Sequence, residues 1–393
     1  MAKRSRKTKI ATRWGAVVIA MLAAVIAAGH VGKLPPAPPS IRAEFGLNIL
    51  AAGWFASIFS ITGMLSAIVF GAVASRFNPW RTAIAGLALM AASSAQLFVS
   101  RFLEGLGFLA VVVAAPSLIA AATSRRERDM ALRFFAAYMP VGVSIMIPAA
   151  PVALDLDGWR LLWVAVVSLA TAGALLMTAT SRSQDIPSQQ RSVPWSAIGK
   201  ALAQPGPWLM AGCFLLYGTQ LYALITWMPT FMIEERGADP AAASVLTALI
   251  VVVNGICSFF GGWLLHRGAA PWATIVTAGA AMAISAYAAF SGAMPDAVRY
   301  LASLTLCGAG GVVAVASYAS APIFTATSGQ TGELNGLIVQ PSNLAQFVGP
   351  TALAAGVSRS GRWESALWLM VGVNAAMMAL ALLVRREEKL VAG

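Results

Sequence analysis

Long apolar runs, separated by short polar segments, make up most of this 393-residue chain. A helix of about 20 apolar residues crosses the hydrocarbon core of a bilayer. The runs therefore predict an all-α integral membrane protein with twelve transmembrane helices. The predicted spans are Trp14–Pro39, Ile49–Ala74, Thr82–Phe98, Arg101–Thr123, Ala131–Leu154, Trp159–Thr180, Pro207–Ile233, Ala241–Leu265, Trp272–Gly292, Val298–Ala321, Asn335–Val357 and Glu364–Val384.

The polar segment 181–206 divides these spans into two sets of six. We interpret it as a cytoplasmic linker between an N-terminal six-helix bundle, residues 1–180, and a C-terminal one, residues 207–393. Each half repeats two glycines and an arginine at intervals of 25 and 5 residues: Gly46, Gly71 and Arg76, then Gly237, Gly262 and Arg267. This repetition favours duplication, and paired repeats with a site at their interface are typical of transporters.

Composition supports the membrane assignment, because 59% of residues are hydrophobic and only 11% are charged, against about 25% charged in soluble domains. With the N-terminus inside, nineteen of the 27 Lys and Arg residues fall in cytoplasmic segments. The positive-inside rule then places both termini in the cytoplasm, and we expect a multi-pass protein of the bacterial inner membrane. Topology explains the net charge of +12, so no nucleic-acid partner is predicted.

The first span ends in an unusual segment, residues 28–39, which contains His30, Lys33 and four prolines. Proline breaks the helical hydrogen-bond ladder, and such a break at membrane depth occurs where it is buried or lines an aqueous cavity. We predict a broken first helix whose His30 and Lys33 face a solute pathway. The alternative is a helix that ends near Gly32, followed by an outer loop that holds Lys33.

Arg101 and Glu104 begin the fourth predicted span, and their spacing of three places them on one helix face. They form either a local ion pair or a site in which Arg101 attracts an anion. In the second case Glu104 or His30 carries a coupling proton, since histidine titrates near pH 6.5. Arg76 to Arg101 is 25 residues and Arg267 to Arg299 is 32. Helices 3 and 4 therefore form a tight hairpin or helix 3 is short, and a short hairpin would lift Arg101 to the outer surface.

Neutral polar residues in the later spans are further candidates for substrate binding, although hydrogen bonds between helices explain each one equally well. They are Tyr217, Gln220, Tyr222, Tyr318, Gln340 and Asn343. Met228 and Met232 are four residues apart and would suit Cu(I), but His266 has no methionine partner four residues later. We expect these methionines to pack, and we predict no metal site.

The segment from Gly71 to Arg81 resembles the glycine–acid–arginine signature of the major facilitator superfamily, and its counterpart runs from Gly262 to Arg267. Ser75 and His266 stand where that signature has an acid. The resemblance implies a twelve-helix transporter whose helices 1, 4, 7 and 10 line a central cavity. It also implies that Gly71, Arg76, Arg81, Gly262 and Arg267 belong to gating loops.

Three shorter motifs are similar to the cyanate and nitroimidazole transporter branch of that superfamily: Gly32 to Pro39, Trp227 to Phe231 and Gln340 to Gln346. We therefore predict a monomeric secondary transporter of a small anion or small polar solute. It would work by alternating access, with protons as candidate coupling ions and no cofactor. The chain has no P-loop and no catalytic constellation, so no enzyme is predicted. The alternatives are efflux of apolar drugs, Cu(I) import, or a non-transporting receptor.

Overall fold

The computed structural model describes residues 12–74, 78–92, 97–124, 127–135, 137–181, 205–320 and 341–392. Regular structure within these ranges consists of thirteen helices and no strand. They are α1 (Trp14–Gly32), α2 (Pro38–Phe45), α3 (Ile49–Ala74), α4 (Pro79–Ala91), α5 (Leu97–Ala122), α6 (Arg128–Phe135), α7 (Tyr138–Ser181), α9 (Pro205–Arg236), α10 (Pro240–His266), α11 (Pro271–Phe290), α12 (Asp296–Ala319), α14 (Pro341–Ser360) and α15 (Ser365–Ala392). Eight of the described helices are long and apolar enough to cross a membrane. The predicted all-α membrane fold is confirmed.

Helix α7 is two helices in sequence, because the backbone leaves the helical region at Asp157 and Gly158. Gly158 has a φ of 66°, a conformation that glycine adopts without the steric cost of a side chain. With the two arms counted separately, and the 8-residue α2 and α6 set aside, twelve long segments remain among the described residues. This agrees with the twelve predicted spans.

Three predicted boundaries are corrected by the structure. The first helix ends at Gly32, not at Pro39, because the proline-rich turn that follows starts a separate short helix. The third runs over Pro79–Ala91, not Thr82–Phe98. Its start is fixed by Asn78, whose side chain accepts a 2.9 Å hydrogen bond from the amide of Trp80, as a helix N-cap does. The predicted span 131–154 is divided between α6 and the first arm of α7.

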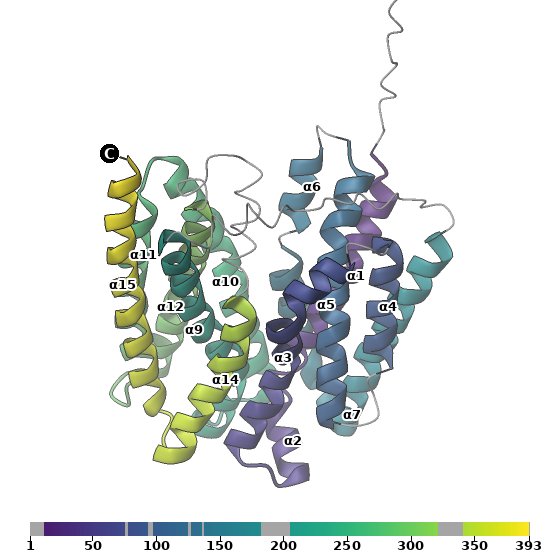
Figure 1. The fold of residues 1–393 in the computed structure, drawn as a ribbon. Coiled ribbons are helices and arrows are strands. Elements are labelled where there is room, and N and C mark those ends of the chain that lie inside the picture. The colour runs from purple at the N-terminus through teal and green to yellow at the C-terminus, as the bar shows by residue number, and fades with distance from the viewer. Residues whose placement is uncertain are drawn as a thin grey trace, which may run out of the picture.

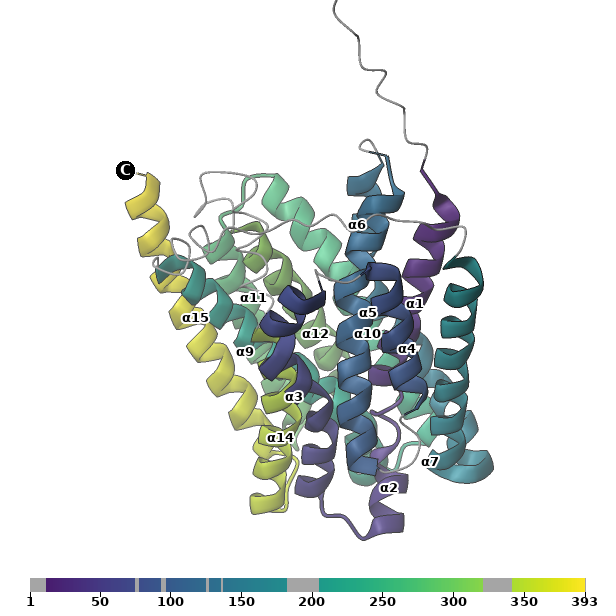
Figure 2. The same ribbon diagram turned by 45° about the vertical axis from the view of Figure 1, so that its right-hand side comes forward.

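The helices form two groups in Figure 1, with α1 and α4–α7 on one side and α9–α12 and α15 on the other. Helices α3 and α14 lie side by side between the groups in both views (Figures 1 and 2). The start of α1 and the end of α15 share one side, here called the terminal face, and α2 lies at the opposite, distal face (Figure 1). The predicted linker falls mostly on residues 182–204, outside the described ranges, so the domain division stays a prediction.

The two groups meet at two helix pairs, α3 with α14 and α7 with α10. In the first pair the hydroxyls of Ser57 and Thr351 lie 2.6 Å apart. The rings of Trp54 and Phe347 have centroids 5.7 Å apart. An ion pair from α2 to the end of α9 adds a contact at the distal face. Contacts of α3 with α14 thus hold the groups together toward the distal face.

Candidate functional site

The end of α1 directs a lysine into the protein interior. Lys33 caps the helix, and its amide donates a 2.9 Å hydrogen bond to the carbonyl of Gly29. Two prolines follow in the turn, and neither has an amide proton with which to continue the helix. The helix therefore ends where the alternative interpretation puts it, at Gly32. Lys33 nevertheless does not belong to an outer loop, because its exposed fraction is 0%.

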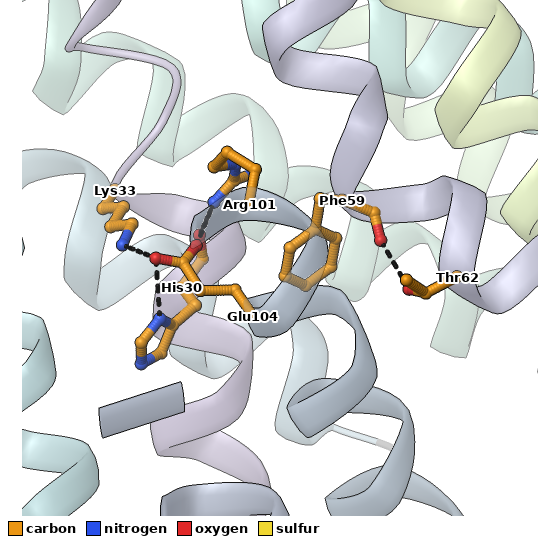
Figure 3. A network of polar contacts seen from close by, with 6 residues as sticks. All are labelled: His30, Lys33, Phe59, Thr62, Arg101 and Glu104. Atoms are coloured by element: carbon orange, nitrogen blue, oxygen red, sulfur yellow. Dashed lines mark hydrogen bonds and ion pairs between the residues drawn. The ribbon is translucent and has the colours of Figure 1, made fainter. Parts of the chain in front are cut away.

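Four side chains from α1, α5 and the turn after α1 form one buried group, here called the charge cluster: His30, Lys33, Arg101 and Glu104 (Figure 3). Lys33 Nζ lies 2.6 Å from Glu104 Oε1, and Arg101 Nη1 lies 2.6 Å from Glu104 Oε2. Each carboxylate oxygen therefore accepts one charge-assisted hydrogen bond, the strong class of such bonds. Arg101 Nη1 also donates to the main-chain carbonyl of His30 at 3.2 Å.

Aromatic rings surround both cations of the charge cluster. Lys33 Nζ lies 4.1 Å from the ring centroid of Trp163 in the second arm of α7. The Arg101 guanidinium carbon lies 4.8 Å from the ring of Phe59 and 5.8 Å from that of Phe55, both on α3. Ring faces attract cations within about 6 Å. The aromatic rings that contact the charge cluster therefore stabilise its positive charges.

The charge cluster carries one surplus positive charge when His30 is neutral, since two cations face one carboxylate. Arg101 is 1% exposed and the other three residues are 0% exposed, so water does not screen that surplus in this conformation. A buried charge is costly unless it is paired. The cluster is thus chemically suited to accept a second anionic group.

His30 contributes an imidazole that has no hydrogen-bond partner for either ring nitrogen within the described ranges. Its Nδ1 lies 3.8 Å from Glu104 Oε1, beyond hydrogen-bond distance. Buried polar groups are almost always paired. The imidazole is therefore available to a ligand or to a proton that moves to or from Glu104.

A close approach of α3 and α5 positions Glu104. A Cβ atom added to Gly105 would lie 2.1 Å from the carbonyl oxygen of Phe59, so only glycine fits. That carbonyl also accepts a 2.9 Å hydrogen bond from the hydroxyl of Thr62 (Figure 3). Arg101 lies one helical turn before Glu104 and is buried. The third helix, α4, is short, with 13 residues, but this does not lift Arg101 to the outer surface.

Three of the neutral candidates pair with polar residues of neighbouring helices that were not themselves candidates. Gln220 and Asn374 exchange two amide hydrogen bonds of 2.8 and 3.1 Å. Tyr217 bonds to Asn254 on α10 at 3.2 Å, and Tyr222 lies 3.3 Å from the hydroxyl of Ser342.

The remaining candidates lie apart from these pairs. Tyr318 packs its ring against Phe214 with centroids 5.2 Å apart. Asn343 of α14 lies against Gly63 of α3, where an added Cβ would be 2.5 Å from Asn343 Oδ1. Gln340 is outside the described ranges. None of these contacts joins a neutral candidate to the charge cluster.

Sequence reasoning missed several partners in these contacts. Asn254 and Asn374 interrupt apolar spans, and an amide inside a span is a signal that marks functional or pairing sites. Trp163, Phe55 and Phe59 carry no such signal, because aromatic residues are ordinary in membrane helices.

The predicted gating residues are only partly described. Gly71 lies near the end of α3, and Arg76 is outside the described ranges. Arg81 is exposed, Gly262 is half-buried in α10, and exposed Arg267 places its guanidinium 4.4 Å over the ring of Trp263. Their gating role stays a prediction.

The predicted methionine pair packs among apolar side chains. Met228 is buried, and Met232 lies partly buried against the same cluster of aliphatic and aromatic residues. Across the residues that the structure describes, no group of three His, Cys, Asp or Glu residues is placed to hold a metal ion.

Comparison with known sequences gives one family. The sequence profile of the Major Facilitator Superfamily matches residues 15–350. A probable sulfoacetate transporter of Cupriavidus necator is 24% identical over 291 residues, which cover 66% of this chain and 66% of that protein. The cis,cis-muconate transport protein of Acinetobacter baylyi is 27% identical over 246 residues, 56% of this chain and 59% of that protein.

A third relative is the 3-(3-hydroxy-phenyl)propionate transporter of Escherichia coli, 25% identical over 238 residues, which cover 58% of this chain and 56% of that protein. This chain thus spans between 56% and 66% of the length of these curated relatives. The substrates in these names are those of the relatives.

Solved structures share the fold over nearly the whole chain. A bacterial homolog of the human lysosomal transporter Spinster, inward-facing and unoccupied, gives a TM-score of 0.77 at 16% identity and covers 98% of this chain and 97% of that one. A D-xylose–proton symporter gives 0.74 at 14% identity, with 94% and 97% covered. At these identities the likeness shows the fold.

Proposed function

This chain belongs to the Major Facilitator Superfamily, and from that premise we propose that it is a secondary active transporter of a small organic anion. The observation that carries the proposal is the surplus positive charge of the buried charge cluster. Lys33 and Arg101 share the single carboxylate of Glu104. An anion that enters the cluster removes this imbalance, whereas a cation or an apolar drug does not.

The relatives support the same class of solute. Their names give sulfoacetate, cis,cis-muconate and a propionate, each the anion of an organic acid. For this chain we propose the same class of solute, an organic anion, and no particular compound.

Proton coupling follows from competition for the two cations. In the ionised state the Glu104 carboxylate occupies Lys33 and Arg101. A proton on Glu104 removes its charge and frees both cations for the carboxylate of a solute. Binding of a proton and of an anion then favour each other, which is the linkage that symport requires. The imidazole of His30, whose Nδ1 lies 3.8 Å from Glu104 Oε1, is placed to relay that proton.

Alternating access is proposed to break the contacts of α3 with α14 near the distal face while the terminal face closes. The division into bundles 1–180 and 207–393, a monomer in the lipid bilayer, the bacterial inner membrane and cytoplasmic termini belong to this proposal. So does the finer resemblance to the cyanate and nitroimidazole branch, whose third motif begins at Gln340, outside the described ranges.

Drug efflux is the second candidate function, because half-buried aromatic residues such as Tyr138 and Tyr318 offer surface that tolerates apolar compounds. The packed environment of Met228 and Met232 disfavours Cu(I) import. A receptor without transport activity would bind an anion and fail to move it.

The test is uptake of radiolabelled cis,cis-muconate, sulfoacetate and 3-(3-hydroxyphenyl)propionate into proteoliposomes with an inward proton gradient. We expect at least one to accumulate, and Lys33→Ala to abolish its uptake. Glu104→Gln mimics the protonated state, so it should retain anion exchange but lose accumulation driven by protons. Arg359→Ala, which removes an exposed cation from the end of α14, is the matched control and should transport normally. Normal transport by Lys33→Ala would show that the anion binds elsewhere.

A further inference from the structure

The indole N–H of Trp163 has no hydrogen-bond acceptor among the residues that the structure describes. Trp163 lies in the second arm of α7 and is 3% exposed, and tryptophan usually pairs its N–H when it is buried. The indoles of Trp80 and Trp227 follow that rule, since each donates to a main-chain carbonyl, at 2.8 and 2.9 Å. Within the described ranges, Trp163 is thus a buried donor that the fold leaves unused.

The ring of Trp163 is held in place next to the charge cluster. It stacks on Phe55 with centroids 6.3 Å apart and an interplanar angle of 26°, and Trp159 meets it edge to face at 5.6 Å. Lys33 Nζ lies 4.1 Å from the ring centroid of Trp163. Because Nε1 belongs to the same ring, the unused N–H and the ammonium group are close neighbours. One ligand can therefore bond to both.

Arg101 contributes a second unused donor to the same cluster. Its Nη1 bonds to Glu104 and to the main-chain carbonyl of His30, whereas its Nε is buried and has no hydrogen-bond partner in the described part of the chain. Each Glu104 oxygen already accepts a hydrogen bond from a cation. The charge cluster therefore holds spare N–H donors on α5 and α7 in addition to its surplus positive charge.

Spare N–H donors beside two cations suit an anion with several oxygen atoms. A carboxylate has two oxygens and about four lone-pair sites, and a sulfonate has three oxygens. One oxygen can replace Glu104 as the partner of Lys33 while another accepts from Trp163, at N–H···O distances of about 2.7–3.2 Å. The indole is neutral, so it responds to the position of an oxygen atom and not to negative charge alone.

We propose that Trp163 is a positioning residue of the anion site, whose N–H donates to a carboxylate or sulfonate oxygen of the solute once a proton on Glu104 has released Lys33. This rests on the proposed anion transport. A buried donor without an acceptor is costly, so the sealed cluster is less stable empty than with an oxyanion bound. Trp163 thereby favours the sealed state only when the solute is present. The substrate class narrows to organic anions whose charged group offers at least two oxygens.

The experiment is calorimetric titration of the purified full chain with cis,cis-muconate, sulfoacetate and 3-(3-hydroxyphenyl)propionate, for the wild type and for Trp163→Phe. Phenylalanine keeps a ring for Phe55 and Lys33 but has no N–H. We expect it to weaken the binding of these anions by roughly tenfold to a hundredfold, the effect of losing one hydrogen bond to a charged group. Trp159→Phe is the matched control on the same helix arm, where the indole donates to Glu44 at 2.7 Å, and it should bind as the wild type does.

A second measurement follows the N–H itself by nuclear magnetic resonance of protein with isotope-labelled tryptophan. The indole resonance that disappears in Trp163→Phe belongs to Trp163. We expect its proton to shift downfield when an anion binds, because a hydrogen bond to a carboxylate or sulfonate deshields it. The resonance that disappears in Trp159→Phe should stay in place. A role of Trp163 in packing alone predicts no such shift.

The outcomes separate the two proposals. Equal affinity of Trp163→Phe and the wild type, or an unmoved Trp163 resonance, would overturn the donor role and leave anion transport standing. Absence of binding by all three anions, with no uptake of their labelled forms, would overturn the transport proposal itself. If Trp163→Phe does not fold, Trp163→Tyr assigns the resonance. A bound anion that shifts none of the 12 indole resonances downfield also contradicts the donor role.

Discussion

Replacement of Glu104 by glutamine is expected to destabilise the protein far more than replacement of Lys33 by methionine. Glu104→Gln keeps the shape of the side chain but leaves Lys33 and Arg101 buried without a counter-charge. Lys33→Met removes one cation and leaves the Arg101–Glu104 pair, whose atoms are 2.6 Å apart, electrically balanced. The two variants change the net charge of the cluster by one unit in opposite directions.

The magnitude follows from the burial of the cluster. Removal of one member of a buried ion pair costs about 3–5 kcal/mol, because the remaining charge is uncompensated. We expect that loss for Glu104→Gln. For Lys33→Met we expect about 1 kcal/mol, since the lost hydrogen bond and the lost contact with Trp163 are offset by relief from burying an ammonium group. At about 2 °C per kcal/mol, the apparent melting temperatures should differ by roughly 4–8 °C.

The assay is thermal unfolding of the purified variants in detergent at neutral pH, with and without a bound organic anion. An anion should raise the melting temperature of Glu104→Gln more than that of the wild type, because it supplies the missing negative charge. Arg160→Met removes an exposed cation and serves as the control, and its melting temperature should stay close to that of the wild type, because exposed ion pairs contribute little. If Lys33→Met proved as unstable as Glu104→Gln, the surplus-charge argument would be wrong.

Two further predictions concern packing and pH. Gly105→Ala should destabilise strongly or prevent folding, since its Cβ would meet a backbone oxygen at 2.1 Å. Gly372→Ala on α15, where nothing lies within 4 Å, should be neutral or stabilise by about 0.5–1 kcal/mol, and thermal unfolding of both variants checks this. Hydrogen bonds from Arg160 hold the pKa of Glu44 below its usual value. Their stabilisation is therefore present at neutral pH and is lost as pH falls below about 4. Glu44→Gln should flatten that part of the stability profile, and an unchanged profile would contradict the assignment.

The hydrophobic pattern was sufficient to predict the membrane class, the number of long helical segments and a separate span from Trp159 to Thr180, because span length depends on bilayer thickness and not on neighbouring helices. The spacing of Arg76 and Arg101 likewise allowed a short third helix, which α4 is. The predicted end of the first helix, at Pro39, was wrong. A run of prolines indicates that a helix breaks, but it does not indicate whether a new helix begins after the break.

Part of the candidate site was predictable and part was not. Arg101 and Glu104 share a helix face at a spacing of three, so their pairing follows from helix geometry. Lys33 and Glu104 are separated by 71 residues, and nothing local indicates that the turn after α1 folds back against α5.

The sequence by itself determined that the chain enters a membrane, where its helices lie along the chain, and which few ionisable groups enter with them. Hydrophobicity and residue spacing are properties of one helical turn or one span, so they can be judged from a short stretch of sequence. The tertiary structure alone decided that both cations share one carboxylate and that His30 faces it at 3.8 Å. Partner choice depends on which helices pack together, and that is settled by close contacts such as Gly105 against the backbone of α3.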